Sequence, residues 1–244
     1  KRDVLRIIDG MVNRGAPVEA NRLFEVLNTF FKWCVEKGYL DAQPMAGLRK
    51  PTKEVSRDRV LSDDELRAVW AAADADGYPY GTFVKLSILL AQRRGELVGA
   101  TWDELDLAAA TWTLPAARTK AGRAHGVPLP APAVAILRDM PVIEGADLLF
   151  PARGRTDVPM SGWSRVITRL RDRSVVADFG LHDLRRTAAS GMASMGVAPH
   201  VLAAILNHAP GSTQGVTSIY NRYRYHDEKR LALDRWAAHV VSLT

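Results

Sequence analysis

The stretch that decides the interpretation of this chain is LHDLRRTAASGMASMGVAPHVLAAILNHAPGSTQGVTSIY, Leu181–Tyr220. His182 and Arg185 stand three residues apart, so on a helix or at a helix start both side chains point the same way. His208 closes a later apolar run, and Tyr220 follows a loop that contains proline and glycine. A cation beside an imidazole, a second imidazole and a late tyrosine together indicate a phosphate site whose nucleophile comes from a separate segment.

Composition narrows the class of protein. The chain has 244 residues, of which 47% are hydrophobic, enough for one large domain or for one domain plus a fragment. It has no run of 18 apolar residues and no signal-peptide pattern, so we expect a cytoplasmic protein without a membrane partner. The single cysteine, Cys34, excludes a disulfide framework and a cysteine zinc site within this chain. Because Lys1 begins in the middle of an apolar pattern, we expect a fragment of a longer protein.

The charge balance suits a polyanionic partner. Lysine and arginine number 33 against 27 acidic residues, for a net charge of +6 and an isoelectric point near 9.6. Nucleic acid is the commonest partner of such a protein. Many soluble proteins carry a similar charge, however, so the charge alone hardly separates these alternatives.

The first part of the chain predicts the end of a helical domain followed by a linker. Apolar residues recur at helical spacing over 1–14 and 16–38. Two helices cannot enclose a core by themselves, so residues 1–45 are interpreted as the C-terminal part of a helical domain. Residues 46–59 are interpreted as a basic interdomain linker. This segment either lies along a DNA backbone or is a solvated tether. Its candidate DNA-binding residues are Arg49, Lys50, Lys53 and Arg57.

Residues 60–244 predict a second domain that is mostly α-helical with a small antiparallel β-sheet, an α+β fold. Ser62 and Glu65 have the spacing of a capping box, so the acidic residues beside them have a structural explanation and are rejected as a metal site. The segments LDLAAATWTLP and HGVPLP predict short strands, connected by the polar ARTKAGRA. Helices are expected over 79–91, 132–140, 161–173, 183–196, 199–207 and 226–241.

The sequence lacks the motifs of several common enzyme classes. The chain contains no GxxxxGK[ST], HExxH or GxSxG motif, which argues against nucleotide hydrolysis, zincin chemistry and a serine hydrolase. A two-metal nuclease needs converging carboxylates, whereas the acidic residues here lie mostly at helix starts and on solvent faces. A metal-free phosphodiester site remains. It needs arginine for the charge on the non-bridging oxygens, a nucleophile that forms a covalent intermediate, and a proton donor for the leaving oxygen.

The chain resembles a known family in which this chemistry occurs. The segments LAQRRGELVGATWDELDL, TKAGRAHGVPL, HDLRRT, LNH and IYNR follow the order seen in tyrosine recombinases, the phage lambda-type integrase family. The RVLSDDEL segment and the YNRYRY ending look most like bacterial prophage and genomic-island integrases. The resemblance implies a catalytic domain over about 57–240. It also implies that residues 1–45 end a helical core-binding domain, whose beginning and arm-binding domain are absent from this chain.

The resemblance assigns the phosphate ligands residue by residue. Arg93 and Arg185 match the two arginines that grip the scissile phosphate, and His208 matches the imidazole that hydrogen-bonds it. Glu96 matches the acidic residue that supports the site, by orienting Arg93 or His182. Each match has an ordinary alternative: Arg93 has Arg94 beside it, His208 can cap a helix end, and Glu96 can be a first-turn helix charge.

The resemblance also assigns the groups that move protons and bonds. Lys120 matches the lysine that protonates the leaving 5′ oxygen, His182 the imidazole that assists deprotonation of the tyrosine, and Tyr220 the nucleophile. Lys120 can instead be a hairpin-tip lysine in water. The loop before Tyr220 is longer than in many relatives, which leaves Tyr223 as the alternative nucleophile. Arg123, beside the lysine, is a further candidate DNA-binding residue.

The function that follows is site-specific integration or excision of DNA through a 3′-phosphotyrosyl intermediate, without metal, ATP or another cofactor. The resemblance implies double-stranded attachment-site DNA, a homotetramer on DNA, a possible monomer in isolation, accessory bending or directionality factors, and a place at the bacterial nucleoid. The last helix, with Trp236 on its apolar face, packs onto a neighbour in that assembly or onto its own domain. A type IB topoisomerase-like enzyme and a non-catalytic DNA-binding protein on the same scaffold are the open alternatives.

Overall fold

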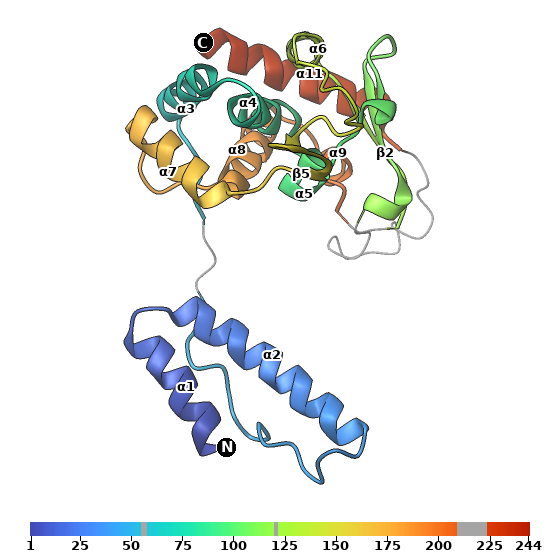
Figure 1. The fold of residues 1–244 in the computed structure, drawn as a ribbon. Helices are drawn as coiled ribbons and strands as arrows, with labels where there is room; N and C mark the ends of the chain where they lie inside the picture. The colour runs from blue at the N-terminus through green and yellow to red at the C-terminus, as the bar shows by residue number, and fades with distance from the viewer. Residues whose placement is uncertain (55–57, 120–121, 209–223) are drawn as a thin grey trace. The chain divides into compact units, whose positions relative to one another are not determined.

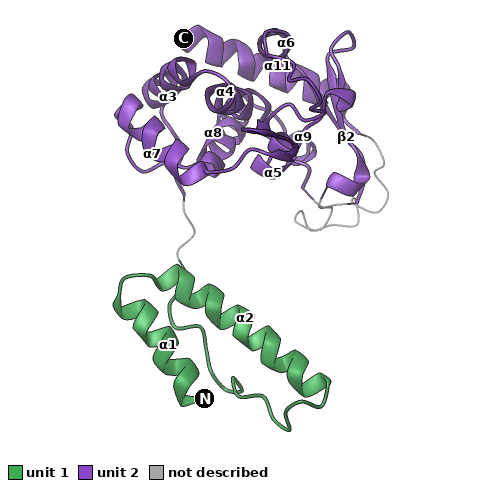
Figure 2. Cartoon of the chain, in the orientation of Figure 1, with its two compact units in different colours: residues 1–57 green, residues 58–244 purple. Residues whose placement is uncertain are grey.

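The computed structural model describes residues 1–54, 58–119, 122–208 and 224–244 (Figure 1). The chain divides into two compact units, Lys1–Arg57 and Asp58–Thr244 (Figure 2). Each unit has its own cluster of buried hydrophobic side chains. The second unit has the larger core, whereas α2 (Pro17–Glu36) of the first unit leaves Val26, Phe30 and Trp33 exposed.

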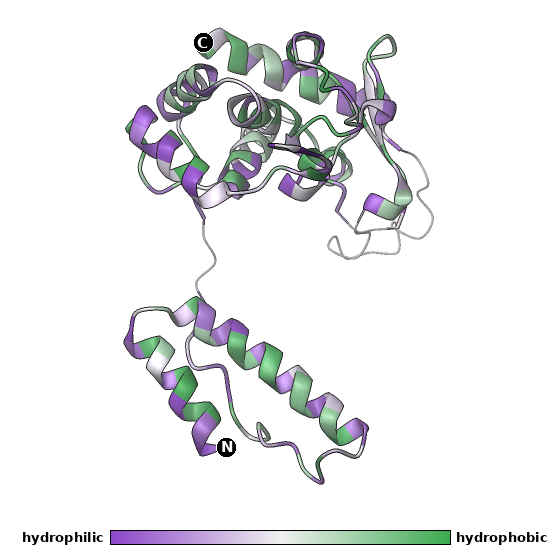
Figure 3. Ribbon diagram, viewed as in Figure 1, coloured by the Kyte–Doolittle hydropathy of each residue, from purple (hydrophilic) through white to green (hydrophobic). Residues whose placement is uncertain are grey.

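The first unit is a pair of helices closed by an extended segment. The helices are α1 (Arg2–Asn13) and α2 (Pro17–Glu36), and hydrophobic and hydrophilic residues alternate along both of them (Figure 3). Proline suits the first turn of α2 because the backbone nitrogen there has no intrahelical partner. The small core contains Ile8, Ala20, Phe24 and Met45, so the segment after α2 contributes to it.

The segment expected to be a linker, residues 46–59, contacts α2 over its first part. Asn21 is completely buried in α2, and its Nδ2 donates to the Thr52 carbonyl and to Glu54 Oε1, both at 2.9 Å. The Thr52 backbone nitrogen donates back to Asn21 Oδ1 at 3.1 Å. A buried amide without partners costs about 1–3 kcal/mol, so these bonds fix residues 52–54 against α2.

The second unit is built around α4, which is hydrophobic on all sides. Its neighbours include α3, α6, α8 and α11 (Figure 1). Burial of a helix from every side requires such an all-round apolar sequence, here YGTFVKLSILL. Within the described residues, the helices of this unit are α3 (Asp63–Asp76), α4 (Tyr80–Leu90), α5 (Arg94–Val98), α6 (Ala131–Arg138), α7 (Trp163–Ser174), α8 (Leu181–Ser194), α9 (Pro199–Ile205) and α11 (His226–Leu243).

The described part of this unit also contains two small antiparallel sheets. The order of the first is β1-β2-β3, and its register pairs Leu114 with His125 across the β2–β3 ladder. The second pairs β4 with β5. The bounds are β1 (Leu105–Asp106), β2 (Thr111–Leu114), β3 (His125–Pro128), β4 (Pro151–Ala152) and β5 (Arg155–Pro159), with short 3₁₀ turns η1 (Trp102–Glu104) and η2 (Ala116–Arg118). The mostly helical α+β fold expected from the sequence is confirmed.

The structure confirms the predicted helix cap of α3 but contains two elements that the sequence did not predict. The capping box of α3 is confirmed, because the Glu65 nitrogen donates to Ser62 Oγ at 3.3 Å and the Ser62 nitrogen donates to Glu65 Oε2 at 2.9 Å. The sequence did not predict α5 or the β4–β5 pair. Five residues are too short for a helical period to emerge, and β5 is mostly exposed, so it lacks an apolar alternation.

The last helix packs onto its own unit. Trp236 of α11 is 2% exposed, and its Nε1 donates to the Ile88 carbonyl of α4 at 2.8 Å. Its ring also covers α8 at Gly191, where an added Cβ would lie 2.3 Å from Trp236 Cζ3. The glycine therefore allows the close approach of α8 and α11. None of the helices in the described part of the chain has the length and apolar content needed to span a membrane.

We predict that Gly191→Ala lowers the free energy of unfolding of the second unit by about 1–3 kcal/mol, because a methyl group at this point overlaps the Trp236 ring. Urea unfolding followed by tryptophan fluorescence measures the change. The matched control is Gly95→Ala in α5, where the added Cβ meets no atom within 4 Å. Equal stabilities of the two variants would contradict the proposed contact.

Candidate phosphate-binding site

The site is organised by the C-terminal end of α9. Asn207 adopts a left-handed conformation, with φ of 46°, which asparagine tolerates better than most residues. The Asn207 nitrogen donates to the Ala204 carbonyl at 3.4 Å, and the His208 nitrogen donates to the Ala203 carbonyl at 3.0 Å. This is the Schellman pattern of hydrogen bonds that ends a helix. It leaves the carbonyls of the next residues, 205–207, available to groups outside the helix.

Those three consecutive carbonyls accept hydrogen bonds from three side chains that lie far away in the sequence. Gln92 Nε2 donates to the Ile205 carbonyl at 3.0 Å. Arg185 Nη2 donates to the next carbonyl, that of Leu206, at 2.6 Å, and Arg93 Nη2 donates to that of Asn207 at 3.2 Å. The C-terminal end of a helix carries partial negative charge, so it stabilises cations at this position.

Arg185 is the buried member of the arginine pair. It lies on α8 with 6% of its surface exposed, and its Nη1 donates to the Ala91 carbonyl at 2.7 Å. Ala91 ends α4 in a left-handed conformation, with φ of 54°, which turns this carbonyl toward the guanidinium. Burial, and secondarily Arg93, lowers the pKa of Arg185 to about 10. The side chain therefore stays protonated at neutral pH, although it is largely removed from water.

Arg93 is fixed by Glu96. The Arg93 backbone nitrogen donates to Glu96 Oε2 at 3.1 Å, which caps the N-terminus of α5, and Arg93 Nη1 donates to Glu96 Oε1 at 2.9 Å. The Glu96 side chain is 6% exposed, whereas that of Arg93 is 32% exposed. One carboxylate thus holds both the backbone and the head group of Arg93. Arg94 is exposed, so of the two adjacent arginines only Arg93 lies in the site.

Two histidines lie within electrostatic reach of the arginine pair. His182, in the first turn of α8, has its pKa lowered by partial burial and then by Arg186 and Arg185. His208, directly after the α9 carbonyls, has its pKa lowered by partial burial and then by Arg185 and Arg93. Lowered pKa values keep both imidazoles neutral at pH 7, so each can accept a proton or a hydrogen bond.

The cluster carries more positive than negative charge. Among the described residues, one carboxylate contacts the two arginines, and the other groups that accept from them are uncharged carbonyls. Carbonyl dipoles stabilise a guanidinium without cancelling its charge, so the pair retains its attraction for an anion. The geometry is that of a binding site for a phosphate group. In the described residues, no group of three or more His, Cys, Asp or Glu side chains is placed to hold a metal ion.

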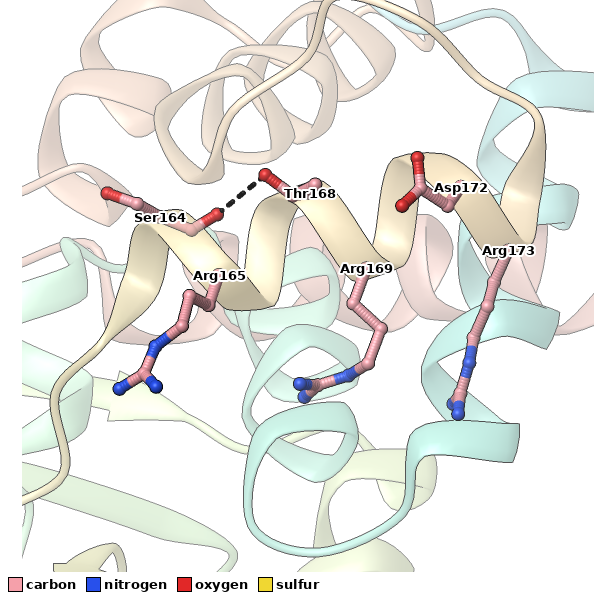
Figure 4. Close-up of a pocket in the computed structure, with 6 residues that line it drawn as sticks. All are labelled: Ser164, Arg165, Thr168, Arg169, Asp172 and Arg173. Carbon is pink, nitrogen blue, oxygen red and sulfur yellow. Dashed lines mark hydrogen bonds between the residues drawn. The ribbon is translucent and has the colours of Figure 1, made fainter.

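A second arginine cluster, on α7, has a different role. Arg165, Arg169 and Arg173 extend to the same side of the helix (Figure 4). Asp76 of α3 accepts from Arg169 Nε at 2.6 Å and Nη2 at 2.7 Å, and from Arg173 Nη1 at 3.0 Å. The Asp76 side chain is only 6% exposed. These bonds join α7 to α3, so we assign Asp76, Arg169 and Arg173 to helix packing.

Several predicted site residues lie elsewhere or outside the described residues. Outside the described residues lie Lys120, Tyr220 and Arg57. Lys50 forms a surface ion pair with Glu25, which raises its pKa. The remaining candidates for DNA contacts are exposed: Arg49, Lys53 and Arg123. Of the seven residues assigned to the catalytic site, the structure brings together Arg93, Glu96, His182, Arg185 and His208.

Four residues around the site were not predicted. Gln92 holds the α9 end, as described above. Arg118 Nη2 donates to the Glu96 carbonyl at 2.6 Å, and its other nitrogen binds the Glu104 carboxylate, which joins η2 to α5. Lys229 of α11, 4% exposed, donates to the Gly126 carbonyl of β3. His125, on the same strand, is 7% exposed. The sequence pattern that could have predicted His125 is its place as a lone polar residue in the apolar segment HGVPLP.

Comparison with known proteins identifies the family of this chain. The model of the phage integrase family matches residues 59–227. The chain therefore belongs to the phage integrase family. The prophage integrase IntA of Escherichia coli K12 is 28% identical over 239 residues, covering 96% of this chain and 57% of the relative. The chain thus spans little more than half of that protein's length.

Solved structures agree on the fold. A lambda integrase dimer bound to a COC′ core site has a TM-score of 0.65 at 19% identity, covering 88% of this chain and 81% of that one. A lambda integrase tetramer bound to a Holliday junction has the same TM-score and identity, covering 88% of this chain and 66% of that one. At this level of identity the likeness establishes the fold, that of the tyrosine recombinase catalytic domain.

The buried imidazole of His125 predicts a specific loss of stability in acid. Burial, and secondarily the charge of Lys229, lowers its pKa from 6.5 to about 4. At a pH between these two pKa values, His125 is protonated in the unfolded chain and neutral in the folded chain. The corresponding stability is present above pH 6.5 and declines as the pH falls toward 4, by about 3 kcal/mol in total. Urea unfolding measures how much the free energy of unfolding falls between pH 7 and pH 5. This fall should be smaller for His125→Leu than for wild type, by about 2 kcal/mol. If the free energy of unfolding falls equally in the two proteins between pH 7 and pH 5, His125 does not cause the loss of stability in acid.

Proposed function

We propose that this chain is the strand-transferring part of a site-specific DNA integrase. It cleaves one strand through a tyrosine and rejoins it to a partner strand. The observation that carries the proposal is the arginine pair, Arg93 and Arg185, held by carbonyls beside two neutral imidazoles. Membership of the phage integrase family supports it. Because the chain spans 57% of IntA, the activity, DNA partner and assembly of the whole protein are part of the proposal.

The arginines bind the non-bridging oxygens of the scissile phosphate. Each guanidinium has five N–H donors, and the protein contacts described above occupy only part of them. In the pentavalent transition state negative charge concentrates on these oxygens, so fixed cations stabilise it more than the ground state. His208 adds a hydrogen bond to the same oxygens, and Glu96 keeps Arg93 in place.

The covalent step exchanges one phosphate ester for another. The Tyr220 oxygen bonds to phosphorus as the bond from phosphorus to the 5′ oxygen breaks. The tyrosine proton passes toward His182, and Lys120 donates a proton to the leaving 5′ oxygen. The bond energy is kept in the 3′-phosphotyrosyl ester, so attack by a 5′ hydroxyl of a partner strand reverses the step without ATP. The roles of Tyr220 and Lys120 rest on the family resemblance, since both lie outside the described residues.

The partners follow from this reaction. The substrate is double-stranded attachment-site DNA, and two rounds of exchange between two duplexes pass through a Holliday junction. Four copies of the protein then act together, an assembly supported by the lambda integrase tetramer. Accessory DNA-bending or directionality factors, and action at the bacterial nucleoid, belong to the same proposal. The exposed Arg49, Lys53 and Arg123 are proposed to contact the DNA backbone.

A suicide duplex, nicked beside the scissile phosphate so that cleavage traps the enzyme, tests the covalent step. We predict that the full-length protein forms a covalent adduct with its attachment-site DNA in EDTA, and that Tyr220→Phe abolishes the adduct because it removes the nucleophilic oxygen. Denaturing gel electrophoresis measures adduct formation. Tyr223→Phe is the matched control and should retain the adduct.

Each result of this experiment separates the alternatives. An adduct that survives in Tyr220→Phe and disappears in Tyr223→Phe would move the nucleophile to Tyr223. Binding of the DNA by wild type without any adduct would support the non-catalytic protein. Cleavage and resealing of one duplex, without exchange between two duplexes, would support the type IB topoisomerase-like enzyme.

We further predict that Glu96→Gln slows cleavage by about 10-fold, because Arg93 loses the charge that fixes its head group. DNA affinity, measured by fluorescence anisotropy, should stay equal or rise, since one negative charge is removed. Asp157→Asn makes the same change of charge at an exposed pair with Arg155 and should leave the cleavage rate unchanged. A parallel fall in affinity and rate for Glu96→Gln would contradict an orienting role.

A further inference from the structure

Gln92 is a buried polar residue to which the proposed reaction gives no role. It lies between Ala91, which ends α4, and Arg93, which caps α5, and it is 3% exposed. Its Oε1 is buried and has no hydrogen-bond partner within the part of the chain that the structure describes. Buried polar side-chain atoms are usually paired, so the unpaired oxygen indicates that the donor end of this side chain fixes its orientation.

The donor end of Gln92 joins two helices. Its Nε2 donates to the Leu90 carbonyl at 2.8 Å and to the Ile205 carbonyl at 3.0 Å. These carbonyls end α4 and α9, where a helix supplies no N–H partner of its own. Turning the amide over would place its oxygen against two other oxygens, so the two hydrogen bonds determine its orientation.

The chain segments on either side of this amide also hold the arginine pair. Arg185 donates to one carbonyl of residues 91–93 and to one of residues 205–207. Arg93 belongs to the first segment and donates to another carbonyl of the second. Of the hydrogen bonds that join the two segments in the described structure, the one from Gln92 is therefore made by an uncharged side chain.

An uncharged link has an advantage when an anion binds. A phosphate oxygen competes with the backbone carbonyls for the N–H groups of Arg93 and Arg185, because a charged acceptor forms the stronger hydrogen bond. Both N–H groups of the Gln92 amide are already used, so this side chain takes no part in the competition. Its bonds keep the two helix ends together while the arginines turn toward the ligand.

We propose that Gln92 is a positioning residue for strand transfer: by joining the ends of α4 and α9, it sets where Arg93 and Arg185 meet the phosphate. An amide suits this position because it donates two hydrogen bonds without adding a third full positive charge to a buried cluster. The inference rests on the proposed integrase function, because its effect is exerted on the arginines that bind the scissile phosphate.

The experiment compares two versions of the suicide duplex with the full-length protein. One carries an ordinary scissile phosphate and the other a methylphosphonate, in which a methyl group replaces a charged oxygen. The arginines stabilise that charge, so misplacing them slows cleavage of the phosphate more than cleavage of the methylphosphonate. A general loss of folded protein lowers both rates equally. The ratio of the two rates is therefore independent of how much of a variant is folded.

We predict that Gln92→Met, which keeps the length of the side chain and removes both donors, slows cleavage of the phosphate duplex by about 10-fold and that of the methylphosphonate duplex by less than about 3-fold. Gln92→Leu has a different shape and also lacks the donors, so it should show the same dependence on substrate.

The matched control is Tyr78→Phe, just before the other end of α4. The Tyr78 hydroxyl donates to the Leu149 carbonyl at 2.9 Å, so this variant also loses a bond from a side chain to a backbone carbonyl. It should retain the wild-type ratio of the two rates, because the carbonyls that hold the arginines are not affected.

Two results would overturn the proposal. One is a wild-type ratio in Gln92→Met, whether both rates fall together or neither changes. The other is an equal change of the ratio in Tyr78→Phe, because weakening either end of α4 would then be sufficient. A failure of the proposed function has a different appearance, since wild type itself would form no adduct with the phosphate duplex. Wild-type cleavage is measured first, so the two failures are separated before any variant is compared.

Discussion

The structure depends on the way two arginines are held at the end of α9 without being neutralised. Arg185 and Arg93 donate to backbone carbonyls, and Glu96 is the carboxylate that contacts the pair. A carboxylate on each arginine would cancel the charge that a phosphate needs. Carbonyl dipoles compensate burial only in part. The pair is thus stable enough to exist in the fold and still charged enough to bind an anion.

This arrangement constrains the backbone around it. Helix α9 must end in a left-handed residue, so that its Schellman bonds leave the carbonyls of residues 205–207 available. Helix α4 must end in a second left-handed residue, Ala91, so that its carbonyl reaches Arg185 from the other side. Alanine accepts this conformation less readily than glycine, at a cost of about 1 kcal/mol.

A basic surface charge and several arginine-rich helices are poor guides to the site. On α7, as in the arginine pair, two guanidiniums lie beside one carboxylate in the described structure, Asp76 in the first case and Glu96 in the second. The difference lies in the partners. Where Asp76 is buried between two arginines, the charge contributes to helix packing. Where carbonyls take that place, the charge remains available for a ligand.

The sequence by itself determined the features that depend on near neighbours. Helical periodicity located the long helices, the Ser62–Glu65 spacing predicted the cap of α3, and the order of motifs selected Arg93, His182, Arg185 and His208. Only the tertiary structure decided which groups hold them. Gln92 bonds to a carbonyl 113 residues away, and Arg185 to one 94 residues away. Periodicity and caps report contacts within about four residues along the chain, so contacts between distant segments leave no pattern there.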